Sequence, residues 1–95
     1  MTERIRESKQ EKKGNDYAVS RGWMVMKFVS PGKRAVPDRQ YLRTKDGVFR
    51  CVFIEWKAPG EEPTPQQYKR GRDIIAAGAE WYWADCLEDV IDVLK

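Results

Sequence analysis

Two groups of residues in this chain have the types and spacing needed for phosphodiester cleavage. Asp38 follows Pro37, and a Glu-x-Lys triplet occupies positions 55–57. Two carboxylates can hold a divalent cation, and a lysine ammonium can steady a hydroxide. Attack on an anionic phosphodiester needs such neutralisation of charge at the phosphate. We therefore interpret Asp38, Glu55 and Lys57 as a candidate metal-dependent site.

The Glu-x-Lys triplet ends an apolar run that predicts a strand over residues 48–56. In a strand alternate residues share a face, so Glu55 and Lys57 point the same way and Trp56 points opposite. Burial of Glu55 beside apolar neighbours is costly unless a cation or hydrogen bonds compensate it. An exposed Glu–Lys ion pair is the alternative. Whether Asp38 lies near Glu55 depends on the strand register, which the sequence leaves open.

Hydrophobic periodicity and turn residues divide the chain, taken as one domain over residues 1–95, into seven elements. We expect helices over residues 3–21, 64–77 and from 85 onward, and strands over residues 23–29, 36–43, 48–56 and 80–84. Asp46-Gly47 predicts a tight hairpin between the second and third strands. The order αβββαβα predicts an α/β fold with a mixed central sheet and flanking helices.

The ends of the three expected helices carry recognisable signals. Gly22 is expected to stop the first helix. Thr64 is expected to cap the second, with Pro65 at its first position, and Asp85 to cap the last. The last helix has an apolar stripe that we assign to the core, formed by Leu87, Val90, Ile91 and Leu94.

The charge of the chain is unevenly distributed. Residues 1–45 hold 12 Lys and Arg against 5 Asp and Glu, whereas residues 46–95 hold 6 against 10. Such asymmetry suits a basic surface facing a polyanion. An ordinary solvated surface of mixed charge is the alternative.

Composition excludes several function classes. The chain has no histidine and two cysteines, Cys51 and Cys86, which removes histidine-based catalysis and zinc-finger spacing. The mean hydropathy is −0.74, and no apolar stretch approaches the ~18 residues that a spanning helix needs. The amino terminus lacks the apolar region of a secretory signal. We therefore expect a cytoplasmic protein.

Five segments, in this order, resemble the virus-type replication-repair nuclease (VRR-NUC) domain. They are Glu7-Ser8-Lys9-Gln10-Glu11, Lys27-Phe28 with Ser30-Pro31-Gly32, Val36-Pro37-Asp38-Arg39, Phe53-Ile54-Glu55-Trp56-Lys57-Ala58-Pro59-Gly60, and Thr64-Pro65-Gln66-Gln67. That family belongs to the PD-(D/E)xK nuclease superfamily, and it includes stand-alone phage proteins. The resemblance implies a restriction-endonuclease-like fold, a metal-dependent deoxyribonuclease activity and, for a phage-encoded protein, the cytoplasm of the bacterial host.

The resemblance also implies a role for each site residue. Asp38, Glu55 and the backbone carbonyl of Trp56 would bind Mg²⁺ or Mn²⁺, and Lys57 would orient the attacking water and help to deprotonate it. Such hard cations prefer oxygen ligands, in agreement with this set and with the absence of histidine. Glu11 matches the family's helical glutamate near the metal, although Glu7, one turn earlier, is the alternative counterpart.

Gln67 and Lys27 can each be interpreted in two ways. Gln67 resembles the family's glutamine that follows the Glu-x-Lys motif and touches the hydroxide or the lysine, but Thr64-x-x-Gln67 also fits a capping box, in which Gln67 returns to the N-cap amide. Lys27 fits a basic residue near the scissile phosphate, and its alternative is an edge-strand lysine that prevents aggregation. Both choices stay open.

Basic residues elsewhere are candidates for contacts to DNA phosphates: Lys33, Arg34, Arg39, Arg43, Lys69, Arg70 and Arg72. The aromatic residues 81–83 could stack on bases, but core packing is the alternative. The resemblance implies a homodimer acting on branched DNA such as four-way junctions. A non-catalytic nucleic-acid-binding or assembly module on the same fold is the alternative function.

Overall fold

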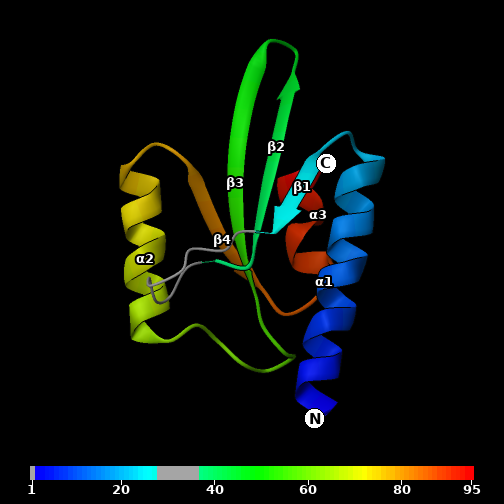
Figure 1. Cartoon of the computed structure of the whole chain (residues 1–95), viewed down its shortest axis with the longest axis vertical. Helices are drawn as coiled ribbons and strands as arrows, with labels where there is room; N and C mark the ends of the chain where they lie inside the picture. Colours follow the sequence, from blue (N-terminus) through cyan, green and yellow to red (C-terminus); the bar gives the residue numbers. More distant parts are fainter. Residues whose placement is uncertain (1, 28–36) are drawn as a thin grey trace.

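A computed structural model of the chain describes residues 2–27 and 37–95. The elements are α1 (Thr2–Ser20), β1 (Met24–Lys27), β2 (Arg39–Lys45), β3 (Val48–Trp56), α2 (Pro65–Ala76), β4 (Glu80–Ala84) and α3 (Glu88–Leu94), drawn in Figure 1. The predicted order αβββαβα is therefore confirmed. Within the described ranges, no helix is long and apolar enough to cross a membrane.

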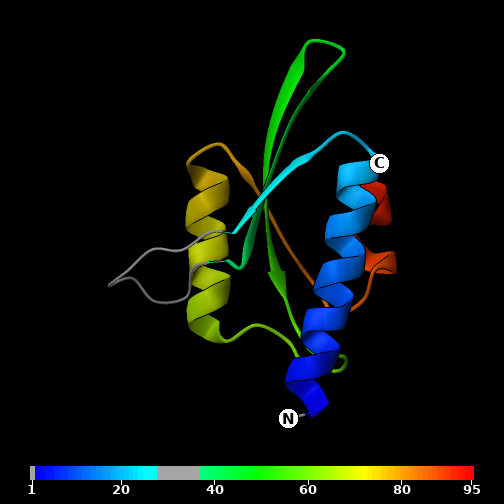
Figure 2. The same cartoon turned by 45° about the vertical axis from the view of Figure 1, so that its right-hand side comes forward.

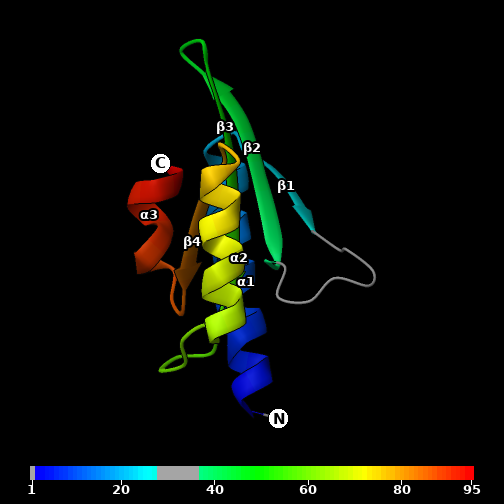
Figure 3. The same cartoon turned by 90° about the vertical axis from the view of Figure 1, so that its left-hand side faces the viewer.

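The sheet has the strand order β1-β2-β3-β4, in which the β1–β2 and β2–β3 pairs are antiparallel and the β3–β4 pair is parallel. Figures 1 and 3 show α2 on one side of this sheet and α1 and α3 on the other. The predicted α/β fold with a mixed sheet and flanking helices is confirmed. The β2–β3 hairpin projects past the helices, as Figure 2 shows.

The hairpin turn has the conformation that its sequence predicts. Asp46 and Gly47 have φ values of 52° and 78°, and Lys45 pairs with Val48 across the turn. Two consecutive residues with positive φ give a turn whose twist matches that of the strands. This turn starts the β2–β3 ladder in the register that continues down to the site.

The buried core lies on the α1 side of the sheet. Alternate residues of β3 point there, so Val52, Ile54 and Trp56 are buried together. Their neighbours in this cluster are Ala18, Trp23, Tyr41, Ala84, Val90 and Leu94. The apolar stripe predicted for the last helix is thus core at Val90 and Leu94, with Leu87 partly buried and Ile91 exposed.

The glycine stop predicted after α1 is present, and a second glycine follows α2 in the same way. Gly22 has a φ of 89°, and the Trp23 N–H donates to the carbonyl of Ala18 over 3.0 Å. Gly78 has a φ of 104°, and the Ala79 N–H donates to the carbonyl of Ile74 over 3.2 Å. These bonds satisfy carbonyls that the end of a helix otherwise leaves unpaired.

Two expected boundaries were wrong. The last helix begins at Glu88 after Leu87, whose side chain makes no capping bond. Asp85 does not cap it, because its carboxylate accepts the N–H of Gly60 over 3.0 Å and so ties the loop after β3 to the end of β4. The second strand, expected over residues 36–43, spans Arg39–Lys45 because the Asp46-Gly47 turn keeps the pairing regular up to Lys45. The expected first strand is present from Met24 to Lys27, and residues 28–29 lie outside the described ranges.

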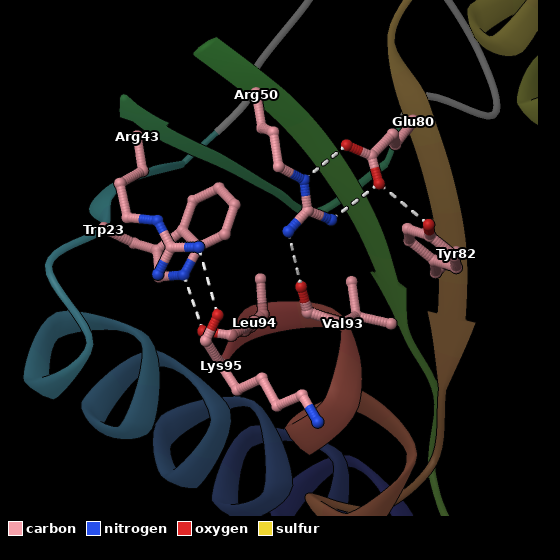
Figure 4. Close-up of polar contacts among 8 residues, drawn as sticks. All are labelled: Trp23, Arg43, Arg50, Glu80, Tyr82, Val93, Leu94 and Lys95. Atoms are coloured by element: carbon pink, nitrogen blue, oxygen red, sulfur yellow. Dashed lines mark hydrogen bonds and ion pairs between the residues drawn. The ribbon is translucent and has the colours of Figure 1, made fainter. Parts of the chain in front are cut away.

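The C-terminal end of α3 is held by side chains from four other elements or junctions. Tyr17 donates to the carbonyl of Ile91, Arg50 to Val93, Trp23 to Leu94 and Arg43 to Lys95, at 3.3, 3.0, 2.7 and 3.1 Å. Figure 4 shows the last three of these contacts. A helix leaves its last carbonyls without helical partners, and here each of these four has a donor.

Arg43 and Arg50 both lie near the Trp23 ring. The Arg43 guanidinium carbon is 4.2 Å from the ring centroid and that of Arg50 is 5.2 Å away. Arg50 also makes two bonds to Glu80, of 2.8 and 2.7 Å (Figure 4). This cluster joins β2, β3, β4 and α3 on the core side of the sheet, and cation–π contacts of this kind add to the hydrogen bonds.

Candidate active site

The strand register brings Asp38 beside the Glu-x-Lys triplet. Arg39 pairs with Ile54 at the end of the β2–β3 ladder, so the next position on each strand sets Asp38 opposite Glu55. The Trp56 N–H donates to Asp38 Oδ2 over 2.9 Å. The proximity that the sequence left open is therefore present.

Glu55 is buried, with only 4 % of its surface exposed. Its Oε2 accepts a hydrogen bond of 3.2 Å from Gln67 Nε2. A surface Glu–Lys ion pair is excluded for this residue, since a surface pair requires exposure. Burial of an ionised carboxylate costs several kcal/mol, on the order of the penalties known for unpaired buried charge, and calls for nearby donors or a cation.

The capping-box interpretation of Gln67 is confirmed, and its side chain also contacts Glu55. Its Oε1 accepts the N–H of Thr64 over 2.8 Å, while its own N–H donates to Thr64 Oγ1 over 3.2 Å. This reciprocal pair is the capping box at the start of α2. The remaining amide group, Nε2, reaches Glu55. The capping box therefore fixes the orientation of the Gln67 amide in which Nε2 donates to Glu55.

Trp56 points to the opposite side of β3, as the alternation predicts. Its ring lies against Gly14 of α1, and its Nε1 donates to the hydroxyl of Tyr41 over 3.0 Å. That hydroxyl in turn donates to Asn15 Oδ1 over 2.5 Å. This chain of contacts fixes α1 against the strand that carries the site. The sequence did not lead us to predict that Gly14, Asn15 and Tyr41 position the site. A glycine in the interior of an expected helix is the signal that could have indicated this close contact.

Three charged side chains, those of Glu11, Arg39 and Lys57, act on the pKa of Asp38. Burial raises the pKa of Asp38, and the nearby carboxylate of Glu11 raises it further. The bond from the Trp56 N–H and the cationic Lys57 and Arg39 lower the same pKa, and the net shift is upward. The ionised form of Asp38 is therefore less stable in the folded protein than it would be in water.

Glu11 comes to the site from α1 and accepts a hydrogen bond from Arg39 Nε through its Oε2. The Glu11 side chain is 18 % exposed and the Arg39 side chain 28 %. Glu7, the alternative counterpart, has a side chain outside those described. Glu11 is therefore brought to the edge of the site, where it is engaged by an arginine.

The chemistry of the donor set fits a divalent cation such as Mg²⁺. Asp38 and Glu55 supply carboxylate oxygens next to the backbone of Trp56, and the upward pKa shift of Asp38 marks a place where an added positive charge is favourable. The carboxylate oxygens of Glu11, Asp38 and Glu55 do not form a ready-made cluster within 4.8 Å. Among described residues that grouping occurs only at Asp85, Cys86 and Asp89, whose two carboxylates already accept backbone N–H groups.

The predicted phosphate-contacting residues are scattered over the molecule. Lys27 is exposed and pairs with Arg39 in the sheet, which puts it at the site end of β1. On α2, Lys69 and Arg72 are exposed and Arg70 is half-buried, with Lys69 3.5 Å from Asp73. Arg43 donates to the carbonyls of Arg21 and Lys95, so its geometry favours a structural role over a phosphate contact. Lys33 and Arg34 lie outside the described residues.

The aromatic residues of β4 have structural partners. A Cβ on Gly71 would lie 2.4 Å from the Trp81 ring, so α2 rests directly on this indole. Tyr68 meets the same ring edge-on, with centroids 6.0 Å apart. The Tyr82 hydroxyl donates to Glu80 over 2.8 Å. For Trp81 and Tyr82 the geometry agrees with packing as the alternative to base stacking. Cys51 and Cys86 are both free thiols.

Comparison with known proteins gives two matches of different kinds. The chain is 42 % identical over 74 residues to a protein named "Putative nuclease p44" from Acyrthosiphon pisum secondary endosymbiont phage 1, covering 78 % of this chain and 76 % of that protein. Its fold matches a solved structure described as a VRR_NUC domain, with a TM-score of 0.75, 20 % identity and coverage of 93 % and 92 % of the two chains. No family model matches the sequence.

Proposed function

The chain belongs to the VRR-NUC family of the PD-(D/E)xK nuclease superfamily, and on that basis we propose that it is a divalent-metal-dependent DNA endonuclease. The broader conclusion, that the chain is a nuclease, follows from its similarity to a phage protein named as a putative nuclease and from its fold. Metal dependence, the roles of individual residues and the preferred DNA structure are proposals. The observation that carries them is the approach of Asp38 to the backbone of Trp56, beside the buried Glu55.

Asp38, Glu55 and the carbonyl of Trp56 are the proposed ligands of the cation. When bound, Mg²⁺ or Mn²⁺ would polarise the phosphate and lower the pKa of a coordinated water. Glu55 is held in one orientation by Gln67, and Asp38 by the Trp56 N–H. These bonds give the two carboxylates a fixed spacing, which reduces the reorganisation needed to bind a cation.

Lys57 is the proposed partner of the attacking water. It follows Trp56 at the end of β3, where its N–H donates to the carbonyl of Ala84 over 2.8 Å. Its ammonium lies close enough to lower the pKa of Asp38. A cation in this position orients a water and stabilises negative charge on the attacking oxygen and on the phosphate. Lys27 on β1 and the basic residues of α2 are proposed to hold the DNA backbone.

Cleavage assays with variants test this function. Purified protein is incubated with linear duplex, flap and four-way-junction DNA in Mg²⁺, Mn²⁺ or EDTA. We expect metal-dependent cleavage that Asp38→Asn, Glu55→Gln and Lys57→Ala each reduce by at least about 100-fold, while DNA binding survives. Glu62→Gln, an exposed loop carboxylate, is the matched control and keeps full activity. Full cleavage by all three site variants would refute the site, whereas binding without cleavage in every metal would favour a non-catalytic module.

We propose further that the protein is a homodimer that acts on branched DNA. β1 is an edge strand, and its Met24 and Met26 are 60 % and 46 % exposed. The register puts both on the same sheet face as Phe49 of the hairpin, which is 63 % exposed. Such an apolar face suits a second subunit, and two sites related by a two-fold axis suit a four-way junction.

Oligomeric state in solution tests the dimer. We expect light scattering coupled to gel filtration to give twice the chain mass for the unmodified protein. Met24→Glu with Met26→Glu should shift it toward monomer and reduce junction cleavage more than duplex cleavage. A monomer at all concentrations would remove the dimer while leaving the nuclease proposal intact.

A further inference from the structure

The ion pair between Arg39 and Glu11 lies at the edge of the proposed metal site. Arg39 directly follows Asp38 and begins β2, and Glu11 lies on α1. In the β2–β3 ladder Arg39 pairs with Ile54, the residue before Glu55. The pair is therefore within electrostatic reach of the carboxylate that is proposed to bind a cation.

A divalent cation can replace Arg39 as the partner of the Glu11 carboxylate. The Glu11 side chain is 18 % exposed and the Arg39 side chain 28 % exposed, so solvent reaches both members and can replace part of their hydrogen bonding when they separate. A divalent cation carries twice the charge of a guanidinium and attracts a carboxylate correspondingly more strongly at equal distance. Glu11 uses Oε2 to bind Arg39. Turning that carboxylate toward a cation beside Asp38 would break this bond.

The surroundings leave space for the released arginine. A hollow of about 340 Å³ lies beside the pair, lined by Glu11, Lys12, Asn15, Asp16 and Arg39. Within it, Lys12 is already paired with Asp16 at 2.8 Å. Arg39 is next to the exposed Lys27 in the β1–β2 ladder, so two cations would then face solvent at the site end of the sheet. A guanidinium offers a planar fork of N–H donors that matches phosphate oxygens.

We propose that the Arg39–Glu11 pair is a metal-sensitive latch: Glu11 leaves Arg39 when a divalent cation binds at Asp38 and Glu55, and the released Arg39 then binds a DNA phosphate. The inference rests on the proposed metal-dependent function. In metal-free protein Arg39 is neutralised and contributes little to DNA binding. Metal and DNA therefore promote each other's binding, and linkage makes this coupling equal in both directions.

The first test measures Mn²⁺ binding without DNA or cleavage, by calorimetry or by the free Mn²⁺ signal in electron paramagnetic resonance. Arg39 competes with the cation for Glu11, so both Arg39→Ala and Arg39→Gln should tighten Mn²⁺ binding about 3- to 10-fold, the range expected for removal of one nearby positive charge. Glu11→Gln should weaken it. Arg21→Ala removes an exposed charge at the far end of α1 and should change nothing. Unchanged or weaker binding in both Arg39 variants would overturn the latch.

The second test measures the DNA affinity of a Lys57→Ala protein, in which cleavage is blocked, in Mg²⁺ and in EDTA. Mg²⁺ should strengthen binding, and adding Arg39→Ala should remove most of that gain while changing the EDTA affinity less than twofold. An equal gain from Mg²⁺ with and without Arg39 contradicts the latch alone. Absence of Mn²⁺ binding by unmodified protein contradicts both the latch and the proposed function, so the two failures are distinguishable.

Discussion

Gly14 of α1 lies so close to the indole ring of Trp56 that no side chain fits between them. A Cβ at position 14 would be 2.3 Å from Trp56 Cζ2 and 2.4 Å from Cη2. Trp56 is the middle residue of the Glu-x-Lys triplet, and Glu11 precedes Gly14 by about one helical turn. The position of Glu11 at the site is therefore set by packing on the strand that carries Glu55 and Lys57.

Gly14→Ala should destabilise the protein, although alanine favours helices. The helix gains about 1 kcal/mol from the loss of glycine, but the clash with a buried indole requires movement of α1, and overpacking costs about 1–3 kcal/mol or more. We expect a lower midpoint in urea unfolding and weaker Mn²⁺ binding through displacement of Glu11. Lys13→Ala, on the exposed neighbouring position, is the control. A Gly14→Ala protein of raised stability would contradict the contact.

Substitutions at Gln67 should separate helix capping from the site. Gln67→Ala removes both bonds and should cost about 1 kcal/mol of stability, as loss of a cap does, with reduced cleavage. Gln67→Glu retains an acceptor for the Thr64 N–H but sets a carboxylate against Glu55, so it should reduce cleavage with a smaller loss of stability. Thermal unfolding and initial cleavage rates measure the two effects. Gln66→Ala, on the adjacent exposed position, should leave both unchanged. Parallel losses in Gln67→Ala and Gln67→Glu would mean that the cap alone matters.

The raised pKa of Asp38 predicts how stability depends on pH in metal-free protein. The folded state binds the proton more tightly than the unfolded state, so ionised Asp38 lowers stability above the folded pKa, and this penalty disappears as pH falls toward the ordinary value of 3.8. Asp38→Asn keeps an acceptor for the Trp56 N–H and removes the charge. It should have a higher Tm than the unmodified protein at neutral pH, with a gap that narrows on acidification. A gap that widens as pH falls would reverse the assigned direction.

Arg50→Lys should lower stability without changing the chemistry of cleavage. Lysine keeps the charge but cannot make two bonds to Glu80 and one to the Val93 carbonyl together, so we expect a loss of about 1–3 kcal/mol. Arg50 also holds the pKa of Glu80 below its ordinary 4.5. The stability from this pair is present above pH 4.5 and is lost as pH falls through the lowered pKa, so the difference between the two proteins should shrink in acid. Urea unfolding at several pH values measures it, with Arg72→Lys as the exposed control.

Much of the fold was predictable from local patterns. The apolar run of β3 gave its bounds at Val48 and Trp56, because turn residues flank it on both sides. The Asp46-Gly47 turn and the Thr64 cap likewise depend on a few adjacent residues whose preferences are strong. The alternation that separates Glu55 from Trp56 follows from strand geometry alone.

The contacts between distant residues were not predictable in this way. The sequence could not decide the β2–β3 register, because a strand slips without changing its own residue pattern. It could not show that Asp85 binds the Gly60 N–H in place of a helix end, or that Arg43 binds carbonyls of Arg21 and Lys95. For Gln67, two uses of one side chain looked like alternatives because sequence spacing does not show that the amide oxygen and nitrogen serve different partners.

The four side chains that bind the last carbonyls of α3 and Lys95 have a consequence for how the protein folds. Its donors at Tyr17, Trp23, Arg43 and Arg50 are separated by 74, 71, 52 and 43 positions from the carbonyls that they bind. Contacts of such long sequence separation raise the contact order and slow the search for the native state. During synthesis the helix and strands that carry the site emerge long before their partners in residues 91–95. We therefore expect a nascent chain to remain loosely packed, and inactive as a nuclease, until residues 91–95 have left the ribosome.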